Sequence, residues 1–127
     1  MKVIIHVAMH DPQLIAASLF GAWNVADRPA RHRALKKVVA SELIYSDPHQ
    51  QEKSVGRDAY LALSDQLHEL IPGFKLELGQ VDGHHDVMRF GSRLFDTSGS
   101  LISIGQFFAV LDHNGRIAIM AAFGAPD

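Results

Sequence analysis

The chain has 127 residues, of which 47% are hydrophobic and 20% are charged, and its formal net charge is −2. This length suits one domain with a substantial core, so we expect a single domain over residues 1–127. A net charge so close to zero gives no general attraction to nucleic acid or anionic lipid, and we expect neither as a partner. Because cysteine is absent, disulfides, thiol nucleophiles and thiolate metal sites are excluded.

The first ten residues, MKVIIHVAMH, form a short apolar run that His6 interrupts. The run lacks the basic segment and the cleavage site of a signal peptide. No segment of the chain approaches the ~20 apolar residues that a membrane span requires. We therefore expect a cytoplasmic protein without membrane contact. Residues 1–10 are expected to be either a loose arm or an added edge strand, because their periodicity does not distinguish the two.

Three helices are predicted in the first half of the chain. Two of them open at Asp11 and Asp27, each followed closely by a proline, which is typical of a helix N-terminus. The third opens near Gly56 and stops before Pro72. Apolar residues at helical spacing give each helix one buried stripe. The stripes are Ile15, Leu19, Ala22, Trp23 and Ala26 in the first helix, Leu35, Val38 and Val39 in the second, and Tyr60, Leu63, Leu67, Leu70 and Ile71 in the third.

The second predicted helix is unusually basic. It carries five of the twelve Lys and Arg residues of the chain, namely Arg28, Arg31, Arg33, Lys36 and Lys37. One interpretation is a patch for phosphate or an anionic partner. We favour the alternative of a solvated helix face, because long cationic side chains are usually exposed.

Extended segments dominate the rest of the chain. Residues 42–47 alternate in part and end at Pro48, which cannot donate to a strand ladder. Later strands are separated by turn signals such as Asp82-Gly83. Those later strands are predicted over residues 74–78, 87–95, 101–111 and 116–123. Helices followed by hairpins indicate an α+β fold, with the helices on one face of a curved antiparallel sheet.

The last two predicted strands are apolar on both faces. In the strand 101–111 the two faces are Ile102, Ile104, Phe108 and Val110, and Gly105, Phe107, Ala109 and Leu111. A sheet that is apolar on both faces must be covered on both, yet the helices cover only one. We therefore predict a homodimer in which sheet packs on sheet.

The order of these elements resembles the nuclear transport factor 2-like superfamily, and within it the SnoaL-like domains. The resemblance spans residues 11–124 and depends on Tyr45-x-Asp47-Pro48, Gly56-Arg57-Asp58 and the segment Asp112-His113-Asn114-Gly115-Arg116-Ile117. It implies a cystatin-like α-β(4) roll, in which a cone-shaped bent sheet wraps around three helices and leaves a deep apolar pocket, commonly in a dimer. The superfamily includes ketosteroid isomerases, polyketide cyclases, epoxide hydrolases, dehydratases and members without catalysis, so the fold alone does not give the function.

Asp47 is the main catalytic candidate, because the resemblance places it at the general-base position of ketosteroid isomerase. That enzyme also needs a Tyr and a protonated Asp as oxyanion donors, and the matching positions here are Leu19 and Phe107. One lost donor costs about 10²–10³ in rate, so steroid isomerisation by that arrangement is not expected. Asp47 is either a general base that shares its face with Tyr45, or a loop residue that accepts backbone N–H groups.

The other candidate residues are weaker. His84 and His85 are neighbours in sequence, so they point to opposite faces and are poor partners for one metal unless the turn distorts them, and we predict no metal site. We predict a solvated hairpin with one of the two histidines turned inward, and for such a histidine the resemblance implies a proton-shuttling role. Arg89 either orients a substrate oxygen or pairs with an acid across the sheet. The predicted pocket wall is Phe20, Trp23, Tyr45, Phe90, Phe107 and Met120.

These observations predict a small-molecule pocket protein. One hypothesis is an enzyme without a cofactor, in which Asp47 and an inward histidine perform acid–base chemistry on an apolar carbonyl compound, as an isomerase, cyclase or dehydratase. The other is a ligand-binding or dimeric assembly module without turnover. An open cavity of ~300 Å³ or more that exposes Asp47 favours the enzyme. Backbone donors on Asp47, or a cavity filled by Phe107 and Trp23, favour the module.

Overall fold

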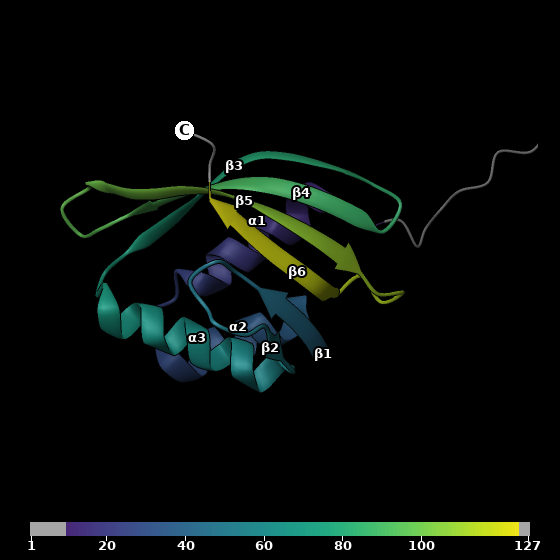
Figure 1. Cartoon of the computed structure of the whole chain (residues 1–127), viewed down its shortest axis with the longest axis horizontal. Helices are drawn as coiled ribbons and strands as arrows, with labels where there is room; N and C mark the ends of the chain where they lie inside the picture. Colours follow the sequence, from purple (N-terminus) through teal and green to yellow (C-terminus); the bar gives the residue numbers. More distant parts are fainter. Residues whose placement is uncertain (1–9, 125–127) are drawn as a thin grey trace, which may run out of the picture.

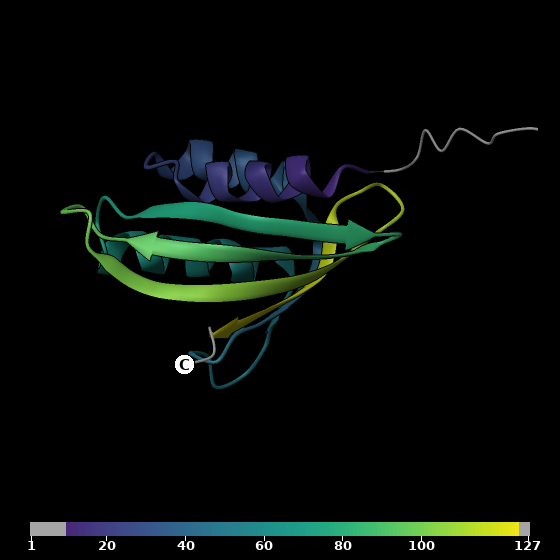
Figure 2. The same cartoon turned by 90° about the horizontal axis from the view of Figure 1, so that it is seen from above.

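A six-stranded sheet curves around three helices in the computed structural model, which describes residues 10–124 (Figure 1, Figure 2). The helices are α1 (Pro12–Trp23), α2 (Arg28–Val38) and α3 (Arg57–Leu70), and the strands are β1 (Val39–Ser46), β2 (Ser54–Val55), β3 (Lys75–His84), β4 (Val87–Phe95), β5 (Leu101–Leu111) and β6 (Ile117–Gly124). The strand order is β2-β1-β6-β5-β4-β3. The predicted α+β class is confirmed, with one parallel pair, β1 with β6, in an otherwise antiparallel sheet.

The predicted arm or edge strand at the N-terminus falls on residues 1–9 and so lies outside the described residues. Within residues 10–124, no helix is both long and apolar enough to cross a membrane.

The predicted helix starts are confirmed, and their caps show why. The carboxylate of Asp11 accepts the N–H of Gln13 at 3.0 Å at the start of α1, and Asp27 accepts the N–H of Ala30 at 3.0 Å at the start of α2. Both bonds satisfy N–H groups that a helix leaves without partners. The third helix has no side-chain cap and begins after Gly56, whose φ is +95°.

The turn between β3 and β4 lies three residues beyond the predicted position. We predicted it at Asp82-Gly83, but β3 continues to His84 and the turn falls at His85 and Asp86. The glycine serves a different purpose: a Cβ atom at Gly83 would lie 2.8 Å from Cγ of Pro12. The absence of a side chain at residue 83 therefore permits the close approach of α1 to β3.

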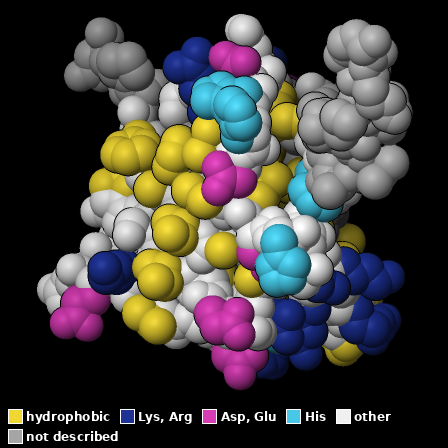
Figure 3. All heavy atoms as spheres, turned by 90° about the vertical axis from the view of Figure 1, so that its right-hand side faces the viewer, with side chains coloured by type: hydrophobic (Ala, Val, Ile, Leu, Met, Phe, Trp, Pro, Cys, Tyr) yellow, Lys and Arg dark blue, Asp and Glu magenta, His cyan; other side chains and the backbone are white. Residues whose placement is uncertain are grey.

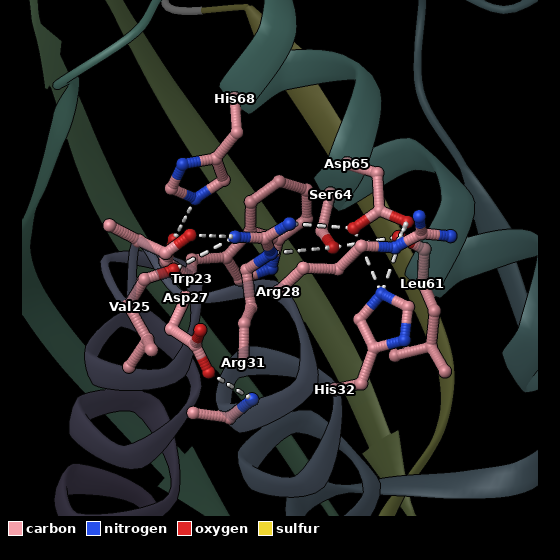
Figure 4. Close-up of polar contacts among 12 residues, drawn as sticks. Trp23, Val25, Asp27, Arg28, Arg31, His32, Leu61, Ser64, Asp65 and His68 are labelled. Carbon is pink, nitrogen blue, oxygen red and sulfur yellow. Dashed lines mark hydrogen bonds and ion pairs between the residues drawn. The ribbon is translucent and has the colours of Figure 1, made fainter.

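The basic surface of α2 is solvated except at Arg31, which corrects our prediction of a uniformly solvated face. The Arg31 side chain is buried and donates to the carbonyl groups of Val25 and Ala26 at 2.9 and 3.0 Å. It also donates to the carboxylate of Asp65 on α3 at 2.6 Å. The same carboxylate forms a second ion pair with Arg28 at 3.1 Å (Figure 4). The resulting polar cluster joins α2 to α3.

The outer face of the sheet, turned away from the helices, is apolar and open to solvent. Its most exposed apolar side chains lie on β5 and β6 and are Ile102, Ile104, Phe108, Ile119 and Phe123. Toward β3 this surface ends at two exposed ion pairs, Arg89 with Asp82 at 3.0 Å and Arg93 with Glu77 at 3.5 Å. Figure 3 shows hydrophobic side chains gathered on one part of the surface, apart from the Lys and Arg side chains at its lower corner.

Candidate ligand pocket

An open pocket of about 770 Å³ lies between α1, α3 and the sheet. Its volume falls in the range of small-molecule sites. Most of its wall is apolar, with contributions from Leu19, Phe20, Leu63, Leu67, Leu94 and Phe107. Phe107 and Trp23 belong to the wall and do not fill the cavity, so the space that the enzyme hypothesis requires is present.

Asp47 lies on the wall of this pocket, just beyond the end of β1. Strand alternation brings it to the side of Tyr45, and Pro48 ends the strand there. One carboxylate oxygen of Asp47, Oδ1, accepts the backbone N–H of His49 at 2.7 Å. Asp47 therefore lines a cavity, as the enzyme hypothesis requires. It also accepts a backbone N–H of its own loop, as the hypothesis of a module without turnover requires.

Two buried tyrosines stand beside Asp47. Tyr45 comes from β1 and Tyr60 from the first turns of α3, and their rings meet edge to face with centroids 5.0 Å apart. Burial, the neighbouring Tyr60 hydroxyl, and the charge and hydrogen bond of Asp47 raise the pKa of Tyr45 far above its ordinary value. The Tyr45 hydroxyl thus stays protonated beside the Asp47 carboxylate.

Tyr60 is held from the other side by α1. Its hydroxyl oxygen accepts the indole N–H of Trp23 at 2.6 Å, and the two rings pack edge to face with centroids 5.6 Å apart. Burial raises the pKa of Tyr60, the bond from Trp23 opposes that rise, and the charge of Asp47 adds to it. The net effect is a raised pKa, so this hydroxyl also keeps its proton. We had predicted Tyr60 only as part of the buried stripe of the third helix. Its hydroxyl is the one polar group in that stripe, and this was the signal for a functional residue that we missed.

The predicted histidines lie elsewhere. His84 and His85 are exposed at the β3–β4 turn, so the prediction that one of them turns inward is wrong. The turn does distort them: His85 has a φ of +55°, and the two Nδ1 atoms lie 3.0 Å apart. Residues 10–124 contain no group of three or more His, Asp or Glu side chains placed to hold a metal ion.

Three further predicted site residues are not on the pocket wall. Arg89 is exposed and pairs with Asp82 across the β3–β4 ladder, which is the alternative to a substrate contact. Phe90 and Met120 are almost fully buried and belong to the core. Phe90 does not reach the cavity because Phe20 and Phe107, which line it, pack against the Phe90 ring. Phe20, Trp23, Tyr45 and Phe107 do line the pocket as predicted.

The remaining polar side chains of the pocket wall are uncharged when His49 is neutral. They are His49, Gln50, Gln66, Ser92 and Ser103. Among the residues that the structure describes, the pocket wall includes no Lys or Arg. Such a wall offers no partner for a phosphate or a carboxylate, and it suits an uncharged ligand with few polar atoms.

Solved structures of other proteins superpose on most of this chain. A proposed isomerase of the SnoaL-like family from Agrobacterium tumefaciens matches with a TM-score of 0.82 and 27% sequence identity, over 91% of this chain and 97% of that one. A proposed SnoaL-like polyketide cyclase from Jannaschia sp. has a TM-score of 0.74 and 14% identity, over 96% and 90% of the two chains. IdmH, a proposed polyketide cyclase from Streptomyces antibioticus, has a TM-score of 0.72 and 15% identity, over 90% and 91%. No protein-family model and no curated protein matches the sequence.

A curved sheet that closes with helices around an apolar pocket defines a class of α+β folds that commonly bind small ligands. Within that class, the chain shares its fold with SnoaL-like proteins of the nuclear transport factor 2-like superfamily. This confirms the resemblance seen in the sequence. Because the group contains several activities, the pocket of this chain must supply the argument for function.

Proposed function

We propose that the pocket binds a small, uncharged and largely apolar carbonyl compound, and that Asp47 removes a proton from the carbon next to the carbonyl group. The observation that carries this proposal is the one carboxylate that residues 10–124 place on the wall of an apolar cavity, beside two protonated tyrosines. A carboxylate in this position is a suitable general base. Isomerisation, aldol-type cyclisation and dehydration can all begin with this step, and the similar proteins described as isomerases and cyclases support the same range.

The proposed step has a clear charge requirement. The proton passes from carbon to a carboxylate oxygen of Asp47, and the negative charge moves to the carbonyl oxygen of the ligand. A hydrogen-bond donor must stabilise that oxygen. The donors of ketosteroid isomerase have no equivalent at Leu19 and Phe107, which are hydrophobic here. A different donor in the wall is needed.

Exchange of the ligand's proton for deuterium tests the role of Asp47 without knowledge of the product. A thermal-shift screen of neutral cyclic ketones would first identify a ligand, since binding raises the unfolding temperature. NMR in heavy water would then measure exchange at the carbon next to the carbonyl group. We expect Asp47→Asn to bind the ketone but to slow exchange by about 10²-fold or more. The asparagine keeps an oxygen for the His49 N–H, so the loop should persist.

Asp112→Asn is the matched control. Asp112 accepts the backbone N–H groups of Asn114 and Arg116 at 2.9 and 3.0 Å, so it plays the same loop role outside the pocket. This variant should exchange the ketone at the rate of the unmodified chain. An Asp47→Asn variant that also keeps the full rate would remove Asp47 from the chemistry.

A second candidate function is ligand binding without turnover. The bond from His49 to Asp47 favours it, because Asp96 and Asp112 make the same bond, from the N–H two residues ahead, in turns outside the pocket. In this case the unmodified chain would bind the ketone and show no exchange above the rate in buffer. The same NMR experiment therefore separates the two functions.

We also propose that the chain forms a homodimer through the outer face of its sheet. The exposed apolar side chains of β5 and β6 would be removed from water by a second copy of the same surface. The ion pairs Arg89–Asp82 and Arg93–Glu77 at its border would remain as a polar rim. A surface that is apolar at its centre and polar at its edge is typical of an interface between proteins.

A further inference from the structure

We infer that Tyr60 is the donor that binds the carbonyl oxygen of the ligand, and that Trp23 is the residue that positions it. This inference depends on the proposed binding of a carbonyl compound, but it does not depend on proton removal by Asp47. It assigns the missing donor to α3, in a position that the sequence comparison with ketosteroid isomerase did not indicate.

The hydrogen bond between Trp23 and Tyr60 leaves the proton of the Tyr60 hydroxyl without a partner among the residues that the structure describes. An indole N–H is a donor only, so in the contact of 2.6 Å between Trp23 and Tyr60 the tyrosine oxygen must accept. The proton of the Tyr60 hydroxyl then has to point elsewhere. Within residues 10–124 the structure shows no acceptor bonded to it. Because Tyr60 is only 1% exposed, bulk water is not a ready partner, and a buried donor without an acceptor is unfavourable.

The pocket is where an acceptor can be supplied. Tyr60 is part of the pocket wall, as are Tyr45 and Asp47. The Tyr60 oxygen is occupied by the Trp23 N–H, and within residues 10–124 no acceptor is bonded to the Tyr60 proton, so that proton is available to a ligand. An oxygen atom of a bound molecule would complete its hydrogen bonding.

The surroundings of Tyr60 hold it in place. Its ring packs edge to face on Trp23 from α1 and on Tyr45 from β1, with centroids 5.6 and 5.0 Å away. A donor that is fixed before the ligand arrives needs no reorganisation when charge develops on the acceptor. The bond from Trp23 also polarises the Tyr60 hydroxyl, which strengthens it as a donor.

Charge decides which oxygen fits. The Asp47 carboxylate is close enough to raise the pKa of Tyr60, so a second negative charge at this point would be repelled. The described wall has no Lys or Arg to offset it. Tyr60 therefore selects the oxygen of a neutral ketone, aldehyde or ester over that of a carboxylate.

Two naphthalene probes of nearly equal shape provide the test. The first is the neutral ketone 2-acetyl-6-(dimethylamino)naphthalene, and the second is its 2-ethyl analogue, which lacks the oxygen. The unmodified chain should bind the ketone about 10-fold more tightly than the analogue, and the carbonyl stretching frequency should fall on binding. In Tyr60→Phe both the preference and the frequency shift should disappear, while binding of the analogue is retained. Trp23→Phe should retain part of each effect.

Tyr45→Phe tests which of the two neighbouring tyrosines is the donor, because it removes the other buried hydroxyl of the pocket wall. If Tyr60 is the donor, this variant should keep the preference for the ketone over the analogue and the frequency shift, whatever its effect on the affinity for both probes. It also gives a second route should Tyr60→Phe fail to fold. The chain contains only two tyrosines. If Tyr45→Phe is expressed with 3-fluorotyrosine in place of tyrosine, the fluorine label is therefore at residue 60 alone. Its fluorine NMR signal should move with the ketone much more than with the analogue.

The outcomes are distinct. Any one of three results overturns the assignment of Tyr60: equal binding of both probes by the unmodified chain, a frequency shift that persists in Tyr60→Phe, or an equal movement of the fluorine signal by both probes. None of these results bears on the existence of the pocket or on the proposed role of Asp47. If neither probe binds the unmodified chain, the proposed binding of a neutral carbonyl compound fails, and the inference about Tyr60 fails with it. Loss of deuterium exchange in Asp47→Asn is measured separately and bears only on the base.

Discussion

Gly21 and Gly56 should respond in opposite directions to replacement by alanine. Gly56 has φ +95° and ψ 150°, a conformation that is open almost only to glycine, and it precedes α3. Gly56→Ala should lower the free energy of unfolding by about 1–3 kcal/mol. Gly21 lies inside α1, and a Cβ atom there would meet no atom within 4 Å. Gly21→Ala should raise the free energy of unfolding by about 0.5–1 kcal/mol.

Urea unfolding checks this pair. Both variants should shift the midpoint without a change in the dependence on urea, since neither alters the surface that unfolding exposes. A stabilising Gly56→Ala would contradict the left-handed backbone at the start of α3.

Single residues of the pocket differ in how far the sequence predicts them. Asp47 is found from a local pattern, a strand that ends in Asp-Pro, and its position on the wall follows from strand alternation. The role of Tyr60 depends on a bond to Trp23, 37 residues away, and no local pattern contains that bond. Gly83 misled us because its missing side chain accommodates Pro12 of a distant helix, whereas we interpreted it as a turn.

Between elements, the contact of α2 with α3 depends on Arg31 and Asp65. The side chain of Arg31 is 3% exposed and that of Asp65 is 15% exposed, so removal of the carboxylate charge leaves a buried guanidinium without its partner. Asp65→Asn should lower the free energy of unfolding at pH 7 by about 3 kcal/mol. Glu69→Gln, at an exposed position of the same helix, should change it by no more than about 0.5 kcal/mol.

The same pair predicts a loss of stability in acid. Burial alone would raise the pKa of Asp65, but hydrogen bonds from Arg31 and His32 and the positive charge nearby lower it. A carboxylate with a lowered pKa in the folded chain stabilises it fully above the unfolded pKa of ~3.9, and the effect is lost as the pH falls through the folded value. The difference in the free energy of unfolding between the unmodified chain and Asp65→Asn should therefore be constant from about pH 5 to about pH 7. It should shrink below about pH 4. A difference that persists unchanged at about pH 2 would argue against this ion pair.

Helical periodicity predicted where α2 and α3 lie but not how they meet. The predicted stripe of α2 correctly contains Leu35, whereas Val39 is buried as the first residue of β1. A long cation such as Arg31 carries no periodic signal for burial. On α3, Leu70 was predicted in the buried stripe and is 78% exposed, because it stands at the helix end beside the pocket. An apolar residue that faces a cavity and one that faces a core follow the same spacing, so the sequence cannot separate them.

For the molecule as a whole, the two apolar faces of β5 and β6 have different surroundings. The inner face carries Phe107, Ala109 and Leu111 and packs on the helices, while the outer face carries Phe108 and stays exposed. Strand alternation was sufficient to predict this division in β5, because a period of two does not depend on distant contacts. In β6 it grouped Ile117 with the exposed Ile119 and Phe123, whereas Ile117 is buried in the core. The dimer that should cover the outer face remains a prediction.

Phe108→Glu tests that dimer most directly. Phe108 is 42% exposed on the outer face and is not part of the pocket wall, whereas its neighbour Ile104 belongs to both. Sedimentation at micromolar concentration should give a dimer for the unmodified chain and a monomer for Phe108→Glu, because two carboxylates would be buried without partners. Lys37→Glu, on the exposed side of α2, changes the formal charge by more than Phe108→Glu does and should still leave the dimer intact. An unmodified chain that sediments as a monomer would show that the apolar outer face is not a contact between copies.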